Sequence, residues 1–339
     1  MPLTQILNKV GQKQDLSSDE ARAAFDAIFE GKIPAEQIGT FLLGLHEKGE
    51  TVDELRGAVA SMRGKAVTIE APPGAIDIVG TGGDAHGTLN ISTAVALVVA
   101  SCGVPVAKHG NRAATSKSGS SDVLTALGVH LEPDMKLLER SLKEINICFL
   151  FAPRHHPAIR HVADVRKKLG VRTIFNLLGP LTNPANVRRH MIGVYELEWL
   201  GPMAEVLKSL GSEVAWLAHG HDGMDKITTT AETDIVELSR GMIRHFTLEP
   251  EMVGLKRVAL DNLKGGDAAH NAEAIRGLFR GEKGAYRDIV LFNASAALIV
   301  AGKAADLQQG MLLAASAIDK GHAARTLADL IRLTNEKAA

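Results

Sequence analysis

Apolar residues recur at helical spacing through the first part of the chain, up to about residue 65. The segment SSDEARAAFDAIFEG has this spacing, and Pro34 opens a second segment of the same kind. Thr51 and Glu54 stand three residues apart before LRGAVASM, a capping-box pattern whose side chains bond the free amides at a helix start. No strand pattern interrupts this region, which predicts a small N-terminal helical domain.

The pattern changes at APPGA, residues 71–75, where short apolar runs begin to alternate with helical segments. The strand candidates are AIDIV, VPVA, ICFLF, MIGVY and VAWLA. Their alternation with helices predicts an α/β domain with a mainly parallel central sheet flanked by helices. Helical spacing returns from about residue 270. We therefore predict a helical domain over residues 1–70 and a larger α/β domain over residues 71–339.

Composition and charge narrow the classes of partner. The chain has 339 residues, 45% of them apolar, and 38 basic against 39 acidic residues give a net charge of −1. No terminal run of basic residues stands out as a nucleic-acid-binding arm, so an anionic ligand must be bound by basic residues at the site itself. Cys102 and Cys148 lie in apolar stretches without metal-ligand spacing, and the most apolar run is broken by Gly103 and Pro105. We expect a cytoplasmic protein with no membrane span and no disulfide framework.

A glycine-rich loop, GTGGDAHGT, follows the strand candidate AIDIV and precedes an apolar helix that opens at Asn90. Glycines let the backbone approach a ligand, and the amides of such a loop and of the helix start favour phosphate. The pattern is neither G-x-G-x-x-G nor a Walker loop. The alternative interpretation is a strand-to-helix turn without a ligand.

Charge placement favours the phosphate interpretation. No carboxylate occurs between Asp84 and Asp122, whereas Lys108, Arg112 and Lys117 lie within ten residues of each other. This segment follows the strand candidate VPVA, so it would leave the carboxyl edge of the sheet beside the glycine loop, where ligands of open α/β sheets bind. Lysine and arginine both suit phosphate oxygens. A solvated basic loop is the alternative; we expect a phosphate-bearing substrate.

Five motifs in order carry a resemblance to a known family: GTGGD, NIST, KHGNRAATSKSGSSDVLTALGV, RHHPAIRHVADVRKKLGVRTIFNLLGPLTNPA and HGHDGMDK. Together they resemble the anthranilate phosphoribosyltransferases through nearly the whole chain. The resemblance implies transfer of the phosphoribosyl group from phosphoribosyl pyrophosphate to anthranilate in tryptophan biosynthesis, with Mg²⁺ as cofactor. It also implies a homodimer, and a helix near residues 157–170 that packs back on the helical domain.

The resemblance assigns site residues as well. Those implied for phosphoribosyl pyrophosphate are Gly80, Thr81, Gly82, Gly83, Asp84, Thr88, Asn90, Ile91, Ser92, Thr93, Lys108, His109, Gly110, Asn111, Arg112, Ala113, Ala114, Thr115, Ser116 and Ser120. Those implied for anthranilate are Gly80, His109, Asn111, Gly179 and Pro180, with Arg166 meeting the substrate carboxylate. Ser92 and Asp225 are the implied magnesium ligands.

One position departs from the family pattern. Where the family usually has Asp-Glu for its magnesium ions, this chain reads Asp225-Lys226. An ammonium cannot ligate Mg²⁺, which leaves three possibilities. Only one ion binds well, or Asp222 takes over as a ligand, or Lys226 itself contacts the pyrophosphate. Alternatively Lys226 faces solvent, or the change impairs activity. His155, His156 and His161 are expected to be structural or pocket-lining, because Mg²⁺ prefers oxygen ligands.

No Ser/His/Asp or Cys/His constellation stands out, which fits a displacement at the sugar's anomeric carbon that needs no covalent protein nucleophile. Two other functions stay open at this point. A pyrimidine nucleoside phosphorylase-like enzyme is disfavoured by the segment NLLGPLTNPA, and a nucleic-acid-binding relative without activity is disfavoured by the net charge and the intact GTGGD and KHGNR motifs.

Overall fold

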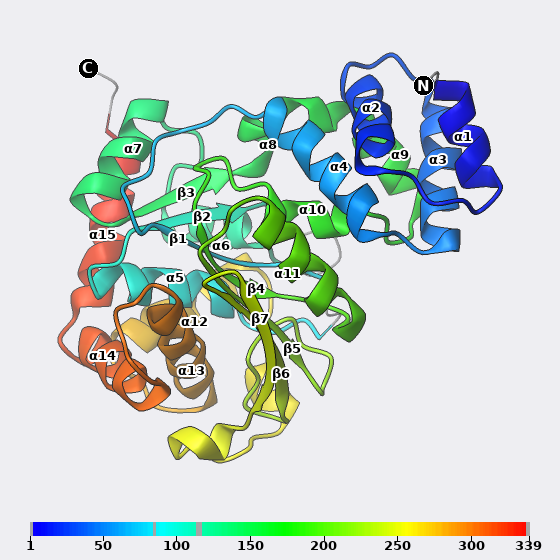
Figure 1. Ribbon diagram of the computed structural model, residues 1–339. Helices are drawn as coiled ribbons and strands as arrows, with labels where there is room; N and C mark the ends of the chain where they lie inside the picture. The colour runs from blue at the N-terminus through cyan, green and yellow to red at the C-terminus, as the bar shows by residue number, and fades with distance from the viewer. Residues whose placement is uncertain (1–2, 84–85, 113–116, 337–339) are drawn as a thin grey trace.

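The computed structural model describes residues 3–83, 86–112 and 117–336 of the chain (Figure 1). Its first part consists of the helices α1 (Leu3–Gly11), α2 (Ser18–Phe29), α3 (Ala35–Lys48) and α4 (Val52–Gly64). The predicted capping box at the start of α4 is confirmed: the Thr51 side chain accepts the Glu54 N–H, and the Glu54 carboxylate accepts the Thr51 N–H. The predicted N-terminal helical domain is therefore present.

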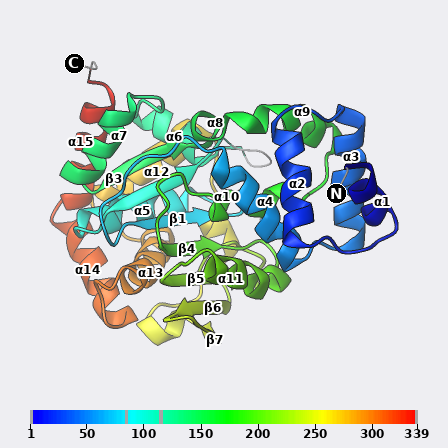
Figure 2. The ribbon, with the colours of Figure 1, turned by 45° about the horizontal axis from the view of Figure 1, so that its top comes forward.

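Segments from the middle of the chain complete the core of this helical domain. They are α8 (Ala152–His155), η1 (Pro157–Ile159), α9 (Arg160–Leu169) and α10 (Phe175–Leu181). α9 contacts both α2 and α3, and Figure 2 shows it beside the blue N-terminal helices. At the start of α10, Phe175 meets Phe25 of α2 edge to face, with ring centroids 5.7 Å apart. Two stretches of sequence thus share one hydrophobic core.

A seven-stranded sheet with the order β3-β2-β1-β4-β5-β6-β7 forms the centre of the larger domain. Five strands run parallel: β1 (Ile76–Gly80), β2 (Val106–Gly110), β3 (Ile147–Phe151), β4 (Arg189–Gly193) and β5 (Val214–Gly220). All five come from the predicted strand segments. The strand order reverses direction beside β1. In open α/β sheets, ligands bind at the carboxyl ends of the strands at such a reversal, which here are the ends of β1 and β4.

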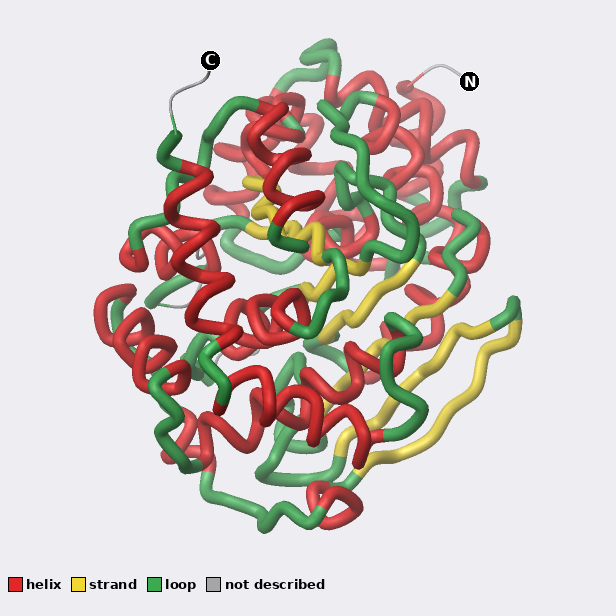
Figure 3. Tube along the Cα trace, turned by 90° about the vertical axis from the view of Figure 1, so that its left-hand side faces the viewer, coloured by secondary structure: helices red, strands yellow, loops and turns green. Residues whose placement is uncertain are grey.

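A hairpin that we did not predict extends one edge of the sheet. β6 (Thr233–Ser239) and β7 (Met242–Leu248) are antiparallel and pair from Ser239 with Met242 outward. Arg240 and Gly241 join them with φ angles of 51° and 73°, the positive pair that a two-residue type I′ turn requires. Figure 3 shows these long strands at the margin of the sheet.

Helices cover both faces of the sheet. The face that carries Ile76 and Ile78 packs against α5 (Ile91–Ser101), α6 (Ser120–Leu127) and the C-terminal helices. The opposite face, with Ile192 and Leu217, packs against α10, α11 and the helical domain, while α7 (Met135–Glu144) covers Cys148 on the same side. The remaining elements are η2 (Leu197–Trp199), α11 (Leu200–Ser209), η3 (Pro250–Val253), η4 (Leu260–Leu263), α12 (Ala268–Phe279), α13 (Ala285–Val300), α14 (Leu307–Asp319) and α15 (His322–Thr334).

These layers confirm the predicted fold class, a small helical domain followed by an α/β domain with a mainly parallel sheet. Within the described residues, no helix combines the length and the apolar character that crossing a membrane requires.

Candidate active site

The glycine loop begins at the last residue of β1, where the strand order of the sheet reverses. Gly80 pairs in register with Gly193, the last residue of β4. A Cβ atom at Gly80 would lie 2.4 Å from the Asp225 carboxylate, and one at Gly193 would lie 1.5 Å from the Asp225 carbonyl oxygen. Both strands therefore need glycine at their ends, because Asp225, from the loop after β5, lies directly across them.

The backbone of the glycine loop is fixed from the β4 side. Thr81 N–H donates to Gly193 O (2.9 Å), and the Thr81 hydroxyl accepts the Tyr195 N–H (3.0 Å). Gly82 and Gly83 follow with φ angles of +70° and +82°, which side chains rarely adopt. α5 starts shortly afterwards at Ile91, whose N–H donates to Leu89 O (2.8 Å). The Asn90 side chain does not cap the helix, so the amides of Ser92 and Thr93 in its first turn face no side-chain cap and suit an anion.

Arg172 holds the far end of the described loop, a role that the sequence motifs did not reveal. Its guanidinium donates to Gly83 O (2.5 Å) and to Glu196 (2.7 Å), and it lies 4.1 Å from the Tyr195 ring centroid. A cavity of about 320 Å³ lies beside it, between the α3–α4 turn and the end of β4, and is lined also by Glu50.

The second predicted phosphate segment leaves β2, which is the neighbour of β1 in the sheet, so both loops emerge at the same edge. Asn111 and Arg112 are exposed there, and the Ser120 hydroxyl at the start of α6 donates to Asn111 O (3.3 Å). Thr88, Ser92 and Ser120 are half-buried. Asp84, Ala113, Ala114, Thr115 and Ser116 lie outside the described residues.

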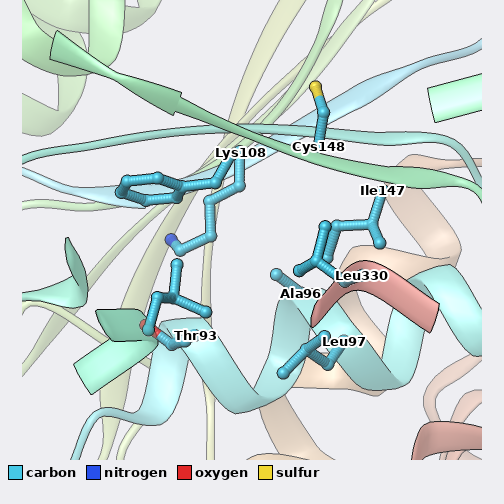
Figure 4. A pocket seen from close by; sticks show the side chains of 9 residues that line it. Thr93, Ala96, Leu97, Lys108, Ile147, Cys148 and Leu330 are labelled. Atoms are coloured by element: carbon cyan, nitrogen blue, oxygen red, sulfur yellow. The ribbon is translucent and has the colours of Figure 1, made fainter. Parts of the chain in front are cut away.

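Lys108 is placed differently from its neighbours in this segment, because it is only 3% exposed. Its Nζ donates to Ile78 O of β1 (2.6 Å). Figure 4 shows the ammonium on the α5 side of the sheet near Thr93, while Cys148 points to the other side. The cavity beside Lys108 measures only about 10 Å³. Because Lys108 lies on β2 and is bonded to β1, it lies within the sheet beneath the two loops.

The acidic loop after β5 holds Asp225 and Lys226. Asp225 is 5% exposed; one carboxylate oxygen accepts the Gly82 N–H (2.9 Å), and the other accepts the Lys226 ammonium. Asp222 turns toward its own loop, where it accepts from Met224 N–H (3.0 Å) and from the hydroxyls of Thr228 (2.7 Å) and Thr230. Lys226 therefore lies against the Asp225 carboxylate, and Asp222 is engaged elsewhere.

The donor set around Asp225 suits one Mg²⁺ ion that is bound largely through a substrate. Mg²⁺ keeps several waters and typically takes one or two carboxylates plus substrate phosphates. Among the described residues, no group of three or more His, Cys, Asp or Glu side chains could hold a metal by itself. Asp225 offers oxygen ligands, while Lys226 adds a positive charge at the carboxylate.

α10 links the other predicted residues. Phe175 at its start lies 5.1 Å under the Arg166 guanidinium. Gly179 follows one turn later on the same face, and its carbonyl oxygen accepts a hydrogen bond from His109 Nδ1 (3.0 Å). Burial lowers the pKa of Arg166, and it lowers the pKa of His109 to about 3, so this imidazole is neutral at pH 7. Arg166 and His109 thus flank the same face of one short helix, which also contains Pro180.

Of the three histidines that follow β3, His155 and His156 are buried and His161 is half-buried. His156 lies 5.2 Å from His109, ring centroid to ring centroid, and burial lowers the pKa of His156 to about 4. His155 Nδ1 is bonded to Val67 O (2.6 Å). His161 lies against Gly31 in the helical domain.

Comparisons with known proteins agree with this geometry. Residues 4–66 match the model "Glycosyl transferase family, helical bundle domain", and residues 72–324 match "Glycosyl transferase family, a/b domain". The chain is 55% identical to the anthranilate phosphoribosyltransferase of Paramagnetospirillum magneticum (98% of this chain, 96% of the relative) and 56% identical to that of Azospirillum brasilense (97% and 92%).

Solved structures show the same relationship. The enzyme from Thermus thermophilus superposes with a TM-score of 0.91 at 41% identity and covers 98% of this chain and 99% of its own. The Saccharomyces cerevisiae enzyme in complex with phosphoribosyl pyrophosphate and Mg superposes with a TM-score of 0.90 at 26% identity, over 98% and 97% of the two chains. Since the likeness spans both domains and nearly the whole chain, this chain belongs to the anthranilate phosphoribosyltransferase family.

Proposed function

We propose that this enzyme transfers the 5-phosphoribosyl group of phosphoribosyl pyrophosphate to the amine of anthranilate, as a step of tryptophan biosynthesis. One observation carries the proposal: two loops suited to phosphate leave adjacent strands at one edge of the sheet, in a chain more than half identical to named anthranilate phosphoribosyltransferases. The phosphorylase and nucleic-acid-binding alternatives have no comparable support.

Phosphoribosyl pyrophosphate would lie between the glycine loop and the loop after β2. The amides of the loop and of the first turn of α5, around Ser92 and Thr93, would bind phosphate oxygens. Asn111, Arg112 and Ser120 would close the site from the β2 side. Lys108 would act from below, as a fixed positive charge under the pyrophosphate.

Magnesium would be held by Asp225 and Ser92 together with the pyrophosphate, and it would neutralise the charge that develops on the leaving group. The Lys226 ammonium, bonded to Asp225, would supply part of the same neutralisation. In this arrangement the protein binds one ion well, and the place of a second is taken by a lysine.

Anthranilate would bind along the face of α10, between Arg166 and His109. Arg166 is half-buried and has no carboxylate within ion-pair distance among the described residues, so its charge is available to the substrate carboxylate. His109 Nε2 is buried and has no hydrogen-bond partner in the described part of the chain. It would therefore be a neutral acceptor near the amine of the bound anthranilate.

The reaction would be a direct displacement. The lone pair of the anthranilate nitrogen forms a bond to the anomeric carbon, the bond from that carbon to the pyrophosphate oxygen breaks, and pyrophosphate leaves with the electron pair. The nitrogen then loses one proton to solvent. The residues orient two substrates, stabilise the leaving anion and exclude water from the sugar carbon, and none forms a covalent intermediate.

Loss of anthranilate fluorescence on addition of phosphoribosyl pyrophosphate and Mg²⁺ tests the proposal directly. Ribose 5-phosphate in place of phosphoribosyl pyrophosphate should give no change, because it lacks the leaving group. Release of free base from a pyrimidine nucleoside with inorganic phosphate, in the absence of any anthranilate turnover, would favour the phosphorylase instead.

The homodimer and the cytoplasmic location are further predictions of the family resemblance. Analytical ultracentrifugation and cell fractionation are the measurements that decide them.

A further inference from the structure

β1 and β2 separate after a single paired position. β1 pairs with β4 at five positions and β2 pairs with β3 at five, whereas β1 and β2 pair only at Ile76 and Val106. Continued in register, Asp77 would pair with Ala107 and Ile78 with Lys108, and the ladder would use the Ile78 carbonyl and the His109 amide. Neither group bonds to the other strand's backbone.

Side chains take these backbone partners instead. The Asp77 carboxylate accepts the His109 N–H (3.0 Å), the Lys108 ammonium donates to Ile78 O (2.6 Å), and the Asn183 amide donates to Ala107 O (2.8 Å). Three backbone groups that a continuous ladder would pair are therefore satisfied by side chains instead of by the other strand.

The side chains of Asp77 and Lys108 enter the gap from opposite faces of the sheet. Strand residues alternate in direction, so Asp77 shares a face with Val79 on the side of the helical domain, whereas Lys108 shares one with Ile78 on the side of α5 (Figure 4). Asp77 is fully buried and Lys108 nearly so. The two side chains thus occupy the space between the strands from both faces of the sheet.

The gap opens where the candidate site lies. β1 ends in the glycine loop three residues after Asp77, and β2 ends in the loop after Gly110. A closed ladder would draw these two loops together and narrow the space between them. A buried carboxylate is costly to desolvate, and burial raises the pKa of Asp77, so packing alone does not account for it.

We propose that Asp77 is a positioning residue for the transfer reaction: it spaces β2 from β1 and thereby sets the width of the phosphoribosyl pyrophosphate site without touching the substrate. The proposal rests on the proposed function for its substrate. Its structural part, the hold on the His109 amide, does not depend on any ligand.

Two substitutions separate the roles of the acceptor atom and of the charge. Asp77→Ala removes the acceptor for His109, and Asp77→Asn keeps an oxygen in the same place without the charge. In calorimetry, the Kd for phosphoribosyl pyrophosphate should be about tenfold or more higher for Asp77→Ala than for the unaltered protein, the equivalent of one buried charged hydrogen bond. Asp77→Asn should recover most of the lost affinity. His190→Asn is the matched control, because His190 pairs with Asp77 in register on β4, is fully buried and bonds to Ser212, away from the site.

Amide exchange supplies a readout without ligand. Asp77→Ala should speed exchange of the β2 peptide that contains His109, whereas Asp77→Asn and His190→Asn should not. If Asp77→Ala folds with unchanged exchange and unchanged affinity, the proposal is wrong. If Asp77→Ala fails to fold, Asn183→Ala is the second test, because it removes the bond to Ala107 between the same two strands. A normal affinity of Asn183→Ala for phosphoribosyl pyrophosphate would also overturn the proposal. If the unaltered protein bound no phosphoribosyl pyrophosphate, the proposed function would fail, and exchange would still decide the role of Asp77.

Discussion

The Asp225 carboxylate accepts the Gly82 backbone N–H at 2.9 Å, which joins the loop after β5 to the glycine loop after β1. Its second oxygen is bonded to the Lys226 ammonium. Any cation that binds Asp225 therefore competes with an amide and with a fixed positive charge. Magnesium binding and the position of the glycine loop are linked through this one side chain.

Lys226→Glu should restore a second equivalent of Mg²⁺ in the presence of phosphoribosyl pyrophosphate, because it replaces the ammonium beside Asp225 with two more oxygen ligands. Calorimetry and the magnesium dependence of the rate, including inhibition at high Mg²⁺, measure this. Lys256→Glu, at an exposed lysine, makes the same charge change elsewhere and should leave both unaltered. Identical magnesium titrations for Lys226→Glu and the unaltered enzyme would show that position 226 lies outside the metal site.

Arg166→Ala should raise the Michaelis constant for anthranilate by roughly ten- to a hundredfold, the equivalent of a lost charged hydrogen bond, while the affinity for phosphoribosyl pyrophosphate stays the same. Steady-state kinetics with each substrate varied in turn distinguish the two effects. Lys168→Ala, at an exposed position of the same helix, is the control. An unchanged constant for anthranilate would remove Arg166 from the site.

Asn293→Ala should lower the free energy of unfolding by about 3 kcal/mol, since it leaves buried backbone groups unsatisfied. The Asn293 amide of α13 accepts Ile227 N–H (3.1 Å) and donates to Ile227 O (2.7 Å), next to Lys226. Ser295→Ala is the control: its hydroxyl bonds only Phe292 O in the same helix, and its loss should cost less than about 1 kcal/mol. Urea denaturation compares them, and equal losses would contradict this role.

His190→Asn should reduce the acid sensitivity of the fold. Burial lowers the pKa of His190 to about 3, whereas in the unfolded chain it lies near the ordinary 6.5. As the pH falls below 6.5, only the unfolded state gains this proton, so the free energy of unfolding falls by about 2 kcal/mol between pH 7 and pH 5 from this group. Urea denaturation at the two pH values should show a smaller drop for His190→Asn than for the unaltered protein. His245→Asn, at an exposed histidine, should show the full drop.

The order of elements was predictable because each parallel strand is a short apolar run between helical patterns. β3, for example, is buried along its whole length. The β6–β7 hairpin was missed, although Arg240-Gly241 between alternating segments is a local turn signal. Its strands carry charged residues such as Glu237 and Arg244, which pair with each other across the hairpin, so they do not form apolar runs like those of the parallel strands.

The candidate site was predictable where chemistry and spacing coincide along the chain, as in the glycine loop and the segment without carboxylates around Lys108. Contacts between distant residues could not be read in this way. Arg172 reaches Gly83 over 89 positions, and Asp77 reaches His109 over 32. A lysine that points to phosphate and one that lies beneath the loops have the same sequence pattern.

The shared core of the helical domain has a consequence for synthesis of the chain. α2 and α3 pack against α9 and α10, so the first helices cannot complete their core until residues 160–181 have left the ribosome. At about 5 to 20 residues per second this delay is on the order of ten seconds, during which the apolar faces of α2 and α3 stay uncovered. While the chain is being synthesised, these uncovered apolar faces of the N-terminal helices are therefore a binding surface for a chaperone.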